Sequence, residues 1–91
     1  MKFSKEVNKF AQSCKRWANR NSFKPEGCRI YPVDGGYLVR VPMSTEWSRG
    51  FFFNGNTVTV FKKCPNPLKW EDHPHSGQVM DYETFNLVYG G

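Results

Sequence analysis

The side chains with the most obvious capacity for chemistry lie in a loop-like stretch of the chain. His73 and His75 stand two positions apart and follow the acidic pair Glu71-Asp72. On an extended segment, two such imidazoles point to one side and can ligate a metal ion or act as an acid/base pair. Pro74 separates them here, and histidines in polar loops commonly have no chemical role. We therefore expect no metal site and no catalytic residue, and a small ribonuclease that uses His73 and His75 is the remote alternative.

The three cysteines do not add a reactive site. Cys14, Cys28 and Cys64 are odd in number and irregularly spaced, which argues against a disulfide framework. The spacing from Cys64 to the histidines matches no recognised zinc pattern. Free thiols are typical of a reducing compartment, so we expect a cytoplasmic protein. The sequence also has no glycine-rich phosphate loop and no nucleophile elbow, and we expect neither enzymatic activity nor a cofactor.

Positive charge is concentrated at the start of the chain. The 91 residues carry a net charge of +5. Residues 1–24 hold seven lysines and arginines against one acid, whereas residues 64–91 hold one lysine against four acids. Such asymmetry bears on partners and encounter rates rather than on the fold. No apolar run approaches the roughly 18 residues that a membrane span requires, so we expect no membrane partner.

Residues 4–20 have the pattern of one amphipathic helix, with Ser4 as its N-cap. Apolar residues recur at helical spacing from Val7 to Ala18. A stripe of cations lies on the side of this helix opposite the apolar residues. Like charges four residues apart cost about 0.2–0.5 kcal/mol per pair, so helix stability does not explain the stripe. That stripe, about 25 Å long, can follow a phosphate backbone or meet an acidic protein surface. The alternative is a solvated face that keeps a small protein soluble. The stripe consists of Lys2, Lys5, Lys9, Arg16 and Arg20.

The middle of the chain predicts two β-hairpins. They are expected at 28–42 and 51–62, each around a short turn that contains glycine. A long irregular loop follows at 63–78, with three prolines. Loops of that length are uncommon in small domains and are often functional.

Residues 82–89 close the chain, and we expect a strand there because apolar and polar residues alternate. The alternative is a short helix that is capped by Asp81 and ended by Gly90. The predicted fold is a single α+β domain over residues 1–91. In it, one N-terminal amphipathic helix packs on one face of a four- to five-stranded antiparallel sheet.

Turn length decides which aromatic side chains of the sheet lie under the helix. A two-residue turn after the run Phe51-Phe52-Phe53 directs Phe51 and Phe53 toward the helix and Phe52 away from it. In the first hairpin, Ile30, Val39 and Val41 are then expected to face the helix. The same reasoning places five side chains on the face away from the helix: Arg29, Tyr31, Arg40, Phe52 and Phe61.

Aromatic rings interleaved with arginines on a sheet suit base stacking and contact with phosphates. Two structural alternatives are open for this face. The loop 63–78 can cover it, with Trp70 and Leu68 as the plug, or a second copy of the chain can pack against it.

The segment Arg49-Gly50-Phe51-Phe52-Phe53 resembles the start of the RNA-recognition submotif K/R-G-F/Y-G/A-F-V-x-F/Y at four of its first five positions. Phe52 replaces a small residue, and Asn54 replaces the valine that follows. The expected element order also differs, because that fold begins with a strand and has two helices. The resemblance therefore does not assign the chain to that family.

These observations predict a small binding protein rather than an enzyme. The leading hypothesis is that its basic helix face binds nucleic acid, or a nucleoprotein enzyme or complex that handles nucleic acid, as a monomer or a homodimer. The second hypothesis is an inhibitor or adaptor that docks on a larger protein. In size and composition the chain is similar to phage accessory proteins that inhibit host defence nucleases, the anti-CRISPR type. The candidate contact residues are Lys5, Lys9, Arg16, Arg20, Arg29, Tyr31, Arg40 and Phe52.

Overall fold

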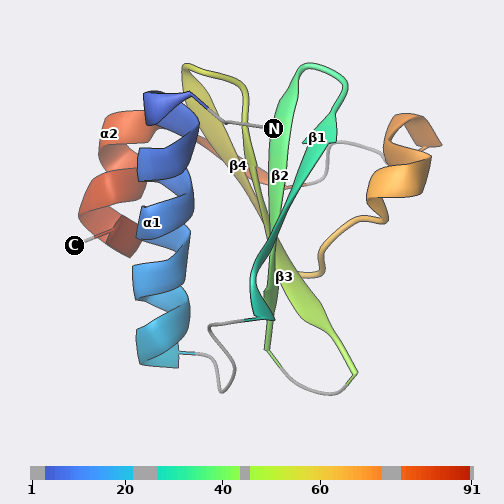
Figure 1. The fold of residues 1–91 in the computed structure, drawn as a ribbon, viewed down its shortest axis with the longest axis horizontal. Helices are drawn as coiled ribbons and strands as arrows, with labels where there is room; N and C mark the ends of the chain where they lie inside the picture. Colours follow the sequence, from blue (N-terminus) through green and yellow to red (C-terminus); the bar gives the residue numbers. More distant parts are fainter. Residues whose placement is uncertain (1–3, 22–26, 44–45, 73–76, 91) are drawn as a thin grey trace.

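The computed structural model describes residues 4–21, 27–43, 46–72 and 77–90, and it has the predicted α+β fold. Five antiparallel strands form one sheet in the order of the chain. Helix α1, Lys5–Asn21, and the C-terminal helical segment lie on one face of this sheet, and a short helix, η2, Pro67–Asp72, lies on the other side (Figure 1). The strands are β1 Arg29–Val33, β2 Gly36–Pro42, β3 Ser48–Phe53, β4 Thr57–Phe61 and β5 Gln78–Asp81.

Helix α1 spans Lys5–Asn21, so the predicted helix is confirmed. The backbone N–H of Val7 donates a hydrogen bond to Ser4 Oγ over 3.3 Å, as expected of an N-cap serine. Val7, Phe10, Cys14 and Ala18 are buried at spacings of three and four residues, which puts all of them on one side of the helix. This apolar side packs on the sheet.

The turn between β3 and β4 uses two residues, Gly55 and Asn56. Gly55 has a φ of +100°, a conformation that favours glycine, and the backbone N–H of Asn54 donates to the carbonyl of Thr57. The register then pairs Phe53 with Val58. Both hairpins are present.

The direction of the three consecutive phenylalanines follows from this register. Phe51 and Phe53 are buried under α1, whereas Phe52 is half-buried on the opposite face. In the first hairpin, Ile30, Val39 and Val41 belong to the same core as Phe51. The predicted side-chain directions are therefore confirmed.

The prediction of a strand at 82–89 is wrong. The chain forms α2, Tyr82–Phe85, followed by a turn of π-helix, η3, Asn86–Gly90. The fifth strand, β5, is formed by Gln78–Asp81 instead. The stretch 63–78, which was predicted to be an irregular loop, contains the 3-10 helix η2, Pro67–Asp72, and its last residue is the first of β5. The alternative interpretation, a short helix capped by Asp81, is the one the structure has.

Two features explain why this segment is helical. Thr84 N–H donates to Asp81 Oδ1 over 2.8 Å, which satisfies one of the free amides of the first turn. Phe85 and Tyr89 are four residues apart, so a helix brings both rings to the core, while Leu87 between them is 79% exposed. The C-terminal segment thereby completes the core beside α1.

The cap at Asp81 predicts a dependence of stability on pH. Hydrogen bonds from the Thr84 side chain and backbone hold the pKa of Asp81 below its ordinary value of 3.8. A lowered pKa in the folded state means that the carboxylate stabilises the fold above the unfolded-state pKa, and that this contribution disappears as the pH falls through the folded-state pKa. Asp81→Asn retains an acceptor but does not titrate.

We therefore expect the urea midpoint of wild type to exceed that of Asp81→Asn at pH 7 and the difference to shrink below about pH 4. Urea titrations of both proteins at several pH values measure this difference. A difference that is the same at all pH values would contradict the role of the charged cap.

Candidate nucleic-acid interface

The predicted stacking face of the sheet is partly covered. The ring of Trp70, from η2, lies 4.8 Å from that of Phe52 and 6.1 Å from that of Phe61, measured between centroids. The indole Nε1 of Trp70 donates to the carbonyl of Asp34 over 3.1 Å, which fixes η2 to the first hairpin. Phe61 is buried as a result. The alternative in which loop 63–78 covers this face is therefore the observed one.

The remaining residues of that face divide between cover and solvent. Leu68, the second expected plug, is 92% exposed and covers nothing. Tyr31 and Phe52 are half-buried beside Trp70, whereas Arg29 and Arg40 are exposed. The two cations of the predicted face are thus exposed to solvent, whereas its aromatic rings are partly buried against the cluster that contains Trp70.

The basic stripe of α1 is divided by the C-terminal helical segment. Arg16 Nε donates to the carbonyl of Gly90 over 3.1 Å, and Arg20 Nη2 donates to the carbonyl of Tyr89 over 2.7 Å. Carbonyls at a helix C-terminus lack partners within the helix and attract cations. Arg16 and Arg20 therefore have a structural role that the sequence did not reveal.

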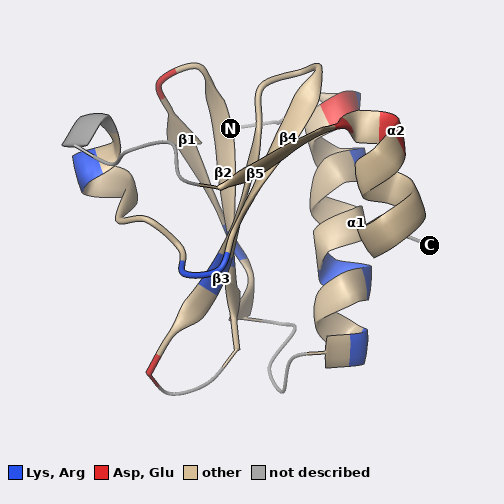
Figure 2. Ribbon diagram, turned by 180° about the vertical axis from the view of Figure 1, so that it is seen from behind, with Lys and Arg blue, Asp and Glu red and all other residues tan. Residues whose placement is uncertain are grey.

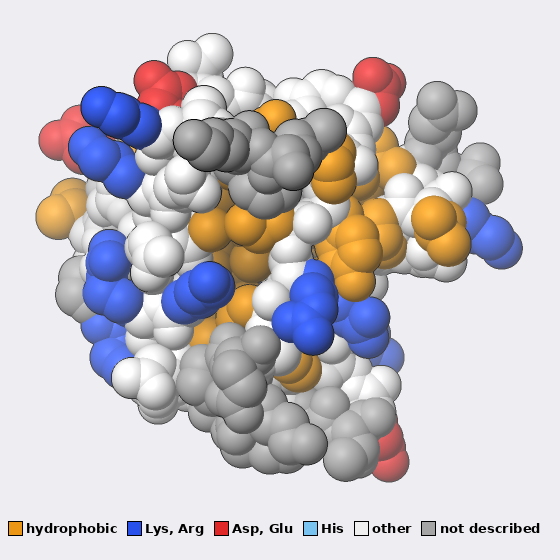
Figure 3. Space-filling view, viewed as in Figure 1, with side chains coloured by type: hydrophobic (Ala, Val, Ile, Leu, Met, Phe, Trp, Pro, Cys, Tyr) orange, Lys and Arg blue, Asp and Glu red, His pale blue; other side chains and the backbone are white. Residues whose placement is uncertain are grey.

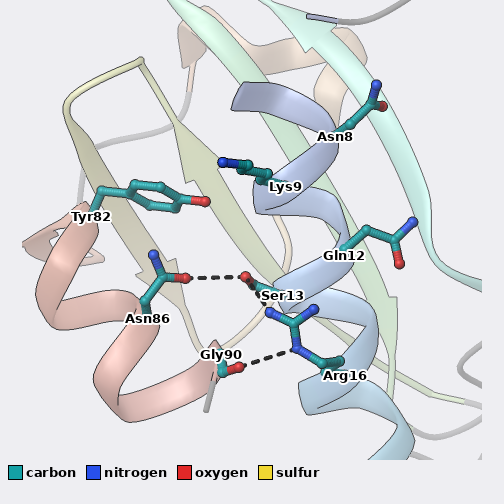
Figure 4. A pocket seen from close by; sticks show the side chains of 8 residues that line it. All are labelled: Asn8, Lys9, Gln12, Ser13, Arg16, Tyr82, Asn86 and Gly90. Atoms are coloured by element: carbon teal, nitrogen blue, oxygen red, sulfur yellow. Dashed lines mark hydrogen bonds between the residues drawn. The ribbon is translucent and has the colours of Figure 1, made fainter. Parts of the chain in front are cut away.

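A groove of about 510 Å³ separates α1 from the C-terminal segment (Figure 4). Ser13 Oγ donates to Asn86 Oδ1 across its floor over 3.1 Å and accepts from Arg16 Nη2 over the same distance. Lys9 lies at the edge nearest Tyr82. The groove is lined by Asn8, Lys9, Gln12, Ser13, Arg16, Tyr82, Asn86 and Gly90.

The exposed cations at the start of α1 have acidic neighbours. Lys5 and Lys9 lie in its first turns, where the segment also contains Glu6. The start of α2, with its acidic residues, lies at the same end of the molecule (Figure 2). Negative charge at this end weakens the attraction of Lys5 and Lys9 for a polyanion. The four helix cations therefore do not present one uninterrupted surface.

A second group of cations gathers at one end of the sheet. Arg29 of β1 is directly opposite Arg40 of β2, and Arg40 is opposite Gly50 of β3. Arg49 lies one position away on β3, and two lysines follow β4 directly. Figure 2 shows these segments of β3 and of the chain after β4 meeting in blue, and Figure 3 shows basic side chains grouped below η2. We call the five cations the basic belt: Arg29, Arg40, Arg49, Lys62 and Lys63.

Packing within the sheet does not require the belt. Like charges directly opposite on neighbouring strands are destabilising, and Arg29 and Arg40 form such a pair. Arg29 Nη1 donates to the carbonyl of Cys28, and Arg40 Nε donates to Ser48 Oγ, both over 3.1 Å. These bonds hold the two guanidinium groups in place beside each other.

Sequence reasoning found Arg29 and Arg40 but missed Arg49, Lys62 and Lys63. Arg49 lies on β3 and the two lysines directly follow β4, so strand pairing alone brings them together. The register of the second hairpin could have revealed them. The two-residue turn that sets the direction of Phe52 also pairs Gly50 with Phe61, and this places Arg49 beside the residues that follow Phe61.

Cys14 and Cys64 are poor nucleophiles at neutral pH. All three are thiols outside any disulfide, and Cys14 and Cys28 are buried. Burial raises the pKa of Cys14 well above its ordinary value, and the nearby Cys28 adds to the effect. Burial also raises the pKa of Cys64 to about 11, although Arg40 acts in the opposite direction. A thiol with a raised pKa is a poor nucleophile because the thiolate is the reactive form.

The described part of the chain contains no group of three or more histidine, cysteine, aspartate or glutamate residues that could hold a metal ion. His73 and His75 lie outside the described residues. Among the helices within those residues, none has the length and apolar character needed to cross a membrane.

Comparison with protein-family models, with curated proteins and with solved structures finds no significant match to this chain.

Proposed function

We propose that this protein is a non-enzymatic binding module that contacts the phosphate backbone of nucleic acid through its basic belt. One observation carries the proposal: three arginines of successive strands and the two lysines that follow β4 lie at the same end of the sheet, with Arg29 and Arg40 on the face away from α1 and Arg49 on the face toward it. A polyanion would supply negative charge at the end of the sheet where these cations gather. The exposed Lys5 and Lys9 lie beside Glu6 at the start of α1, at the other end of the molecule, and contribute only as distant cations.

The charges elsewhere favour one orientation of the ligand. Asp34 lies in the turn between β1 and β2, and Glu6 and Glu83 lie near the starts of α1 and α2. These three residues are at the opposite end of the strands from the belt, whereas Glu46, two residues before β3 begins, is at the belt end (Figure 2). A molecule polarised in this way steers an anionic partner toward its basic end, and the attraction falls as salt rises.

The test compares pairs of charge removals in a mobility-shift assay with generic single- and double-stranded DNA and RNA. With about five phosphate contacts, the logarithm of affinity is expected to fall with the logarithm of salt with a slope of roughly −4. Arg29→Gln/Arg40→Gln removes two contacts and should make the slope shallower by about 2. Lys5→Gln/Lys9→Gln should have a smaller effect.

Lys15→Gln/Lys69→Gln is the matched control, because both lysines are exposed and outside the belt. It removes the same net charge and is expected to leave the slope nearly unchanged. A control that weakens binding as much as Arg29→Gln/Arg40→Gln would show that only net charge matters. The absence of any shift at low salt would reject direct nucleic-acid binding.

The second candidate function is docking on a larger protein as an inhibitor or adaptor. It is favoured by two adjacent apolar side chains on the C-terminal segment, Leu87 and Val88, which are 79% and 60% exposed. Apolar residues at such exposure are suited to a protein interface. If nucleic acid does not bind, affinity capture with wild type and with Leu87→Ser/Val88→Ser tests this candidate. The candidate is supported if wild type captures a protein that the double variant does not capture.

A further inference from the structure

We propose that the belt contains a discrete phosphate site, in a groove lined by Arg49 at the start of β3 and by the two lysines that follow β4. The groove has a volume of about 590 Å³ and combines cationic and polar side chains with apolar walls. The inference rests on the proposed function for its biological ligand, but the affinity of the site for phosphate is measurable by itself. The lining residues that carry the argument are Arg49, Lys62, Lys63, Gln78 and Tyr89.

Within the described part of the chain, Arg49 is held in place by aromatic rings rather than by an acid. Its guanidinium carbon lies 5.2 Å from the ring centroid of Trp17 and 6.0 Å from that of Trp47. Cation–π contacts orient a guanidinium without neutralising its charge. A fixed and still charged guanidinium is well suited to an oxyanion, because its donors form a rigid fork.

The hydrogen bonds of Arg49 are not satisfied within the described residues. Its Nε is buried and has no hydrogen-bond partner there, while the side chain as a whole is half-buried and lines the groove. Leaving a buried donor unsatisfied generally costs about 1–3 kcal/mol, and more when the group is charged. An anion in the groove would give the other donors of the guanidinium a partner that the described residues do not supply.

The two lysines add charge at the same place. The register pairs Gly50 with Phe61, so Arg49 and Lys62 occupy the next position along the two strands. Lys63 follows directly, and no acidic residue lines the groove among the described residues. Three cations without a carboxylate among them match a phosphate group, which has more acceptor oxygens than a carboxylate and carries one negative charge as a diester and up to two as a monoester.

The groove is larger than a phosphate ion needs. The amide of Gln78 and the phenol of Tyr89 supply further polar groups, and Val60 and Phe61 form apolar walls. A site of this volume accommodates a ligand the size of a nucleotide. We therefore expect a phosphate group attached to a sugar and base, either within a nucleic-acid strand or as a free nucleotide.

The experiment titrates the full-length protein with inorganic phosphate, then with a mononucleotide, then with a short single-stranded oligonucleotide, at constant ionic strength. The readouts are indole fluorescence, because Trp17 and Trp47 flank Arg49, and the Nε–H resonance of Arg49 in ¹⁵N-labelled protein. A saturable shift of the Arg49 resonance by phosphate, not reproduced by chloride, is expected. Arg49→Lys keeps the charge but loses the fork, and should weaken phosphate binding by about tenfold.

Lys62→Gln/Lys63→Gln provides the decisive variant if Arg49→Lys does not fold, because both lysines are exposed. It should also weaken phosphate binding by at least about tenfold, since two of three charges are removed. Lys15→Gln/Lys69→Gln is the matched control and should bind phosphate as wild type does. Unchanged binding by Lys62→Gln/Lys63→Gln, or no saturable response in wild type, overturns the site.

The three ligands separate this inference from the proposed function. Phosphate binding without oligonucleotide binding would retain the site, assign it to a free nucleotide and reject the nucleic-acid proposal. Oligonucleotide binding without a response of Arg49 would retain the proposed function and reject the site.

Discussion

Replacing Phe85 by alanine is expected to lower the free energy of unfolding by about 3–5 kcal/mol. Phe85 is fully buried, and its ring centroid lies 5.4 Å from that of Phe10, 5.7 Å from that of Phe51 and 5.4 Å from that of Tyr89. The substitution removes a ring that joins α1, β3 and the C-terminal helical segment, and it leaves a cavity among three elements.

Urea denaturation followed by circular dichroism measures the effect, with the midpoint expected to fall while the slope stays the same. For a domain of this size the total stability is on the order of 5–10 kcal/mol, so the loss approaches half of it. Leu87→Ala is the control, because Leu87 is largely exposed and should change stability by less than about 0.5 kcal/mol.

This pair of variants also tests the conformation of the C-terminal segment. In a strand, residues 85 and 87 would lie on the same face, and their truncation would have similar effects. In the observed helix they point in different directions. Equal losses for Phe85→Ala and Leu87→Ala would contradict the helical assignment.

The directions of the sheet side chains could be predicted from the sequence because they depend on local rules. Side chains alternate along a strand, and the turn at Gly55 and Asn56 has the common length of two residues. Once that length is given, Phe51, Phe52 and Phe53 are assigned to their faces. No information about distant parts of the chain is needed.

The C-terminal segment could not be assigned in this way, because its pattern fits two periods. Phe85, Leu87 and Tyr89 alternate with other residues as in a strand, but Phe85 and Tyr89 are also one helical turn apart. The choice depends on tertiary structure. Gln78–Asp81 already occupies the free edge of β4, and the core beside α1 accommodates both rings.

The candidate site was only half predictable for the same reason. Arg16 and Arg20 lie on α1 as expected, but their hydrogen bonds to the C-terminal carbonyls depend on a helix where a strand was expected. The position of the Arg49 side chain depends on its contacts with Trp17 and Trp47, and no sequence pattern connects these residues to Arg49. Charge patterns along one helix are visible in a sequence, whereas charges gathered by strand pairing require the register.

The contact between η2 and the sheet gives the second large effect, in the variant Trp70→Ala. Trp70 is only 9% exposed, and its ring covers Phe52 and Phe61. We expect a loss of about 3–5 kcal/mol in the free energy of unfolding, because a large buried ring is removed together with the hydrogen bond to Asp34. Binding of a hydrophobic dye to the folded protein should increase, since the substitution uncovers Phe52 and Phe61.

Trp70→Phe separates the two contributions. It keeps most of the packing and loses the indole N–H, so the expected loss is about 1–2 kcal/mol. Leu68→Ala, on the same helical turn but 92% exposed, should have no measurable effect. A loss for Trp70→Ala no larger than that of Leu68→Ala would show that η2 does not cover the sheet.

The same variant distinguishes the role of the covered face from that of the basic belt. Trp70 is bonded to Asp34 in the turn between β1 and β2, whereas the belt lies at the other end of these strands. If phosphate contacts at the belt dominate, Trp70→Ala should leave the salt dependence of oligonucleotide binding unchanged while the protein is folded. A gain in affinity for single strands with the same salt slope would instead mean that the uncovered Phe52 and Phe61 stack on bases, and that η2 competes with the ligand for this face.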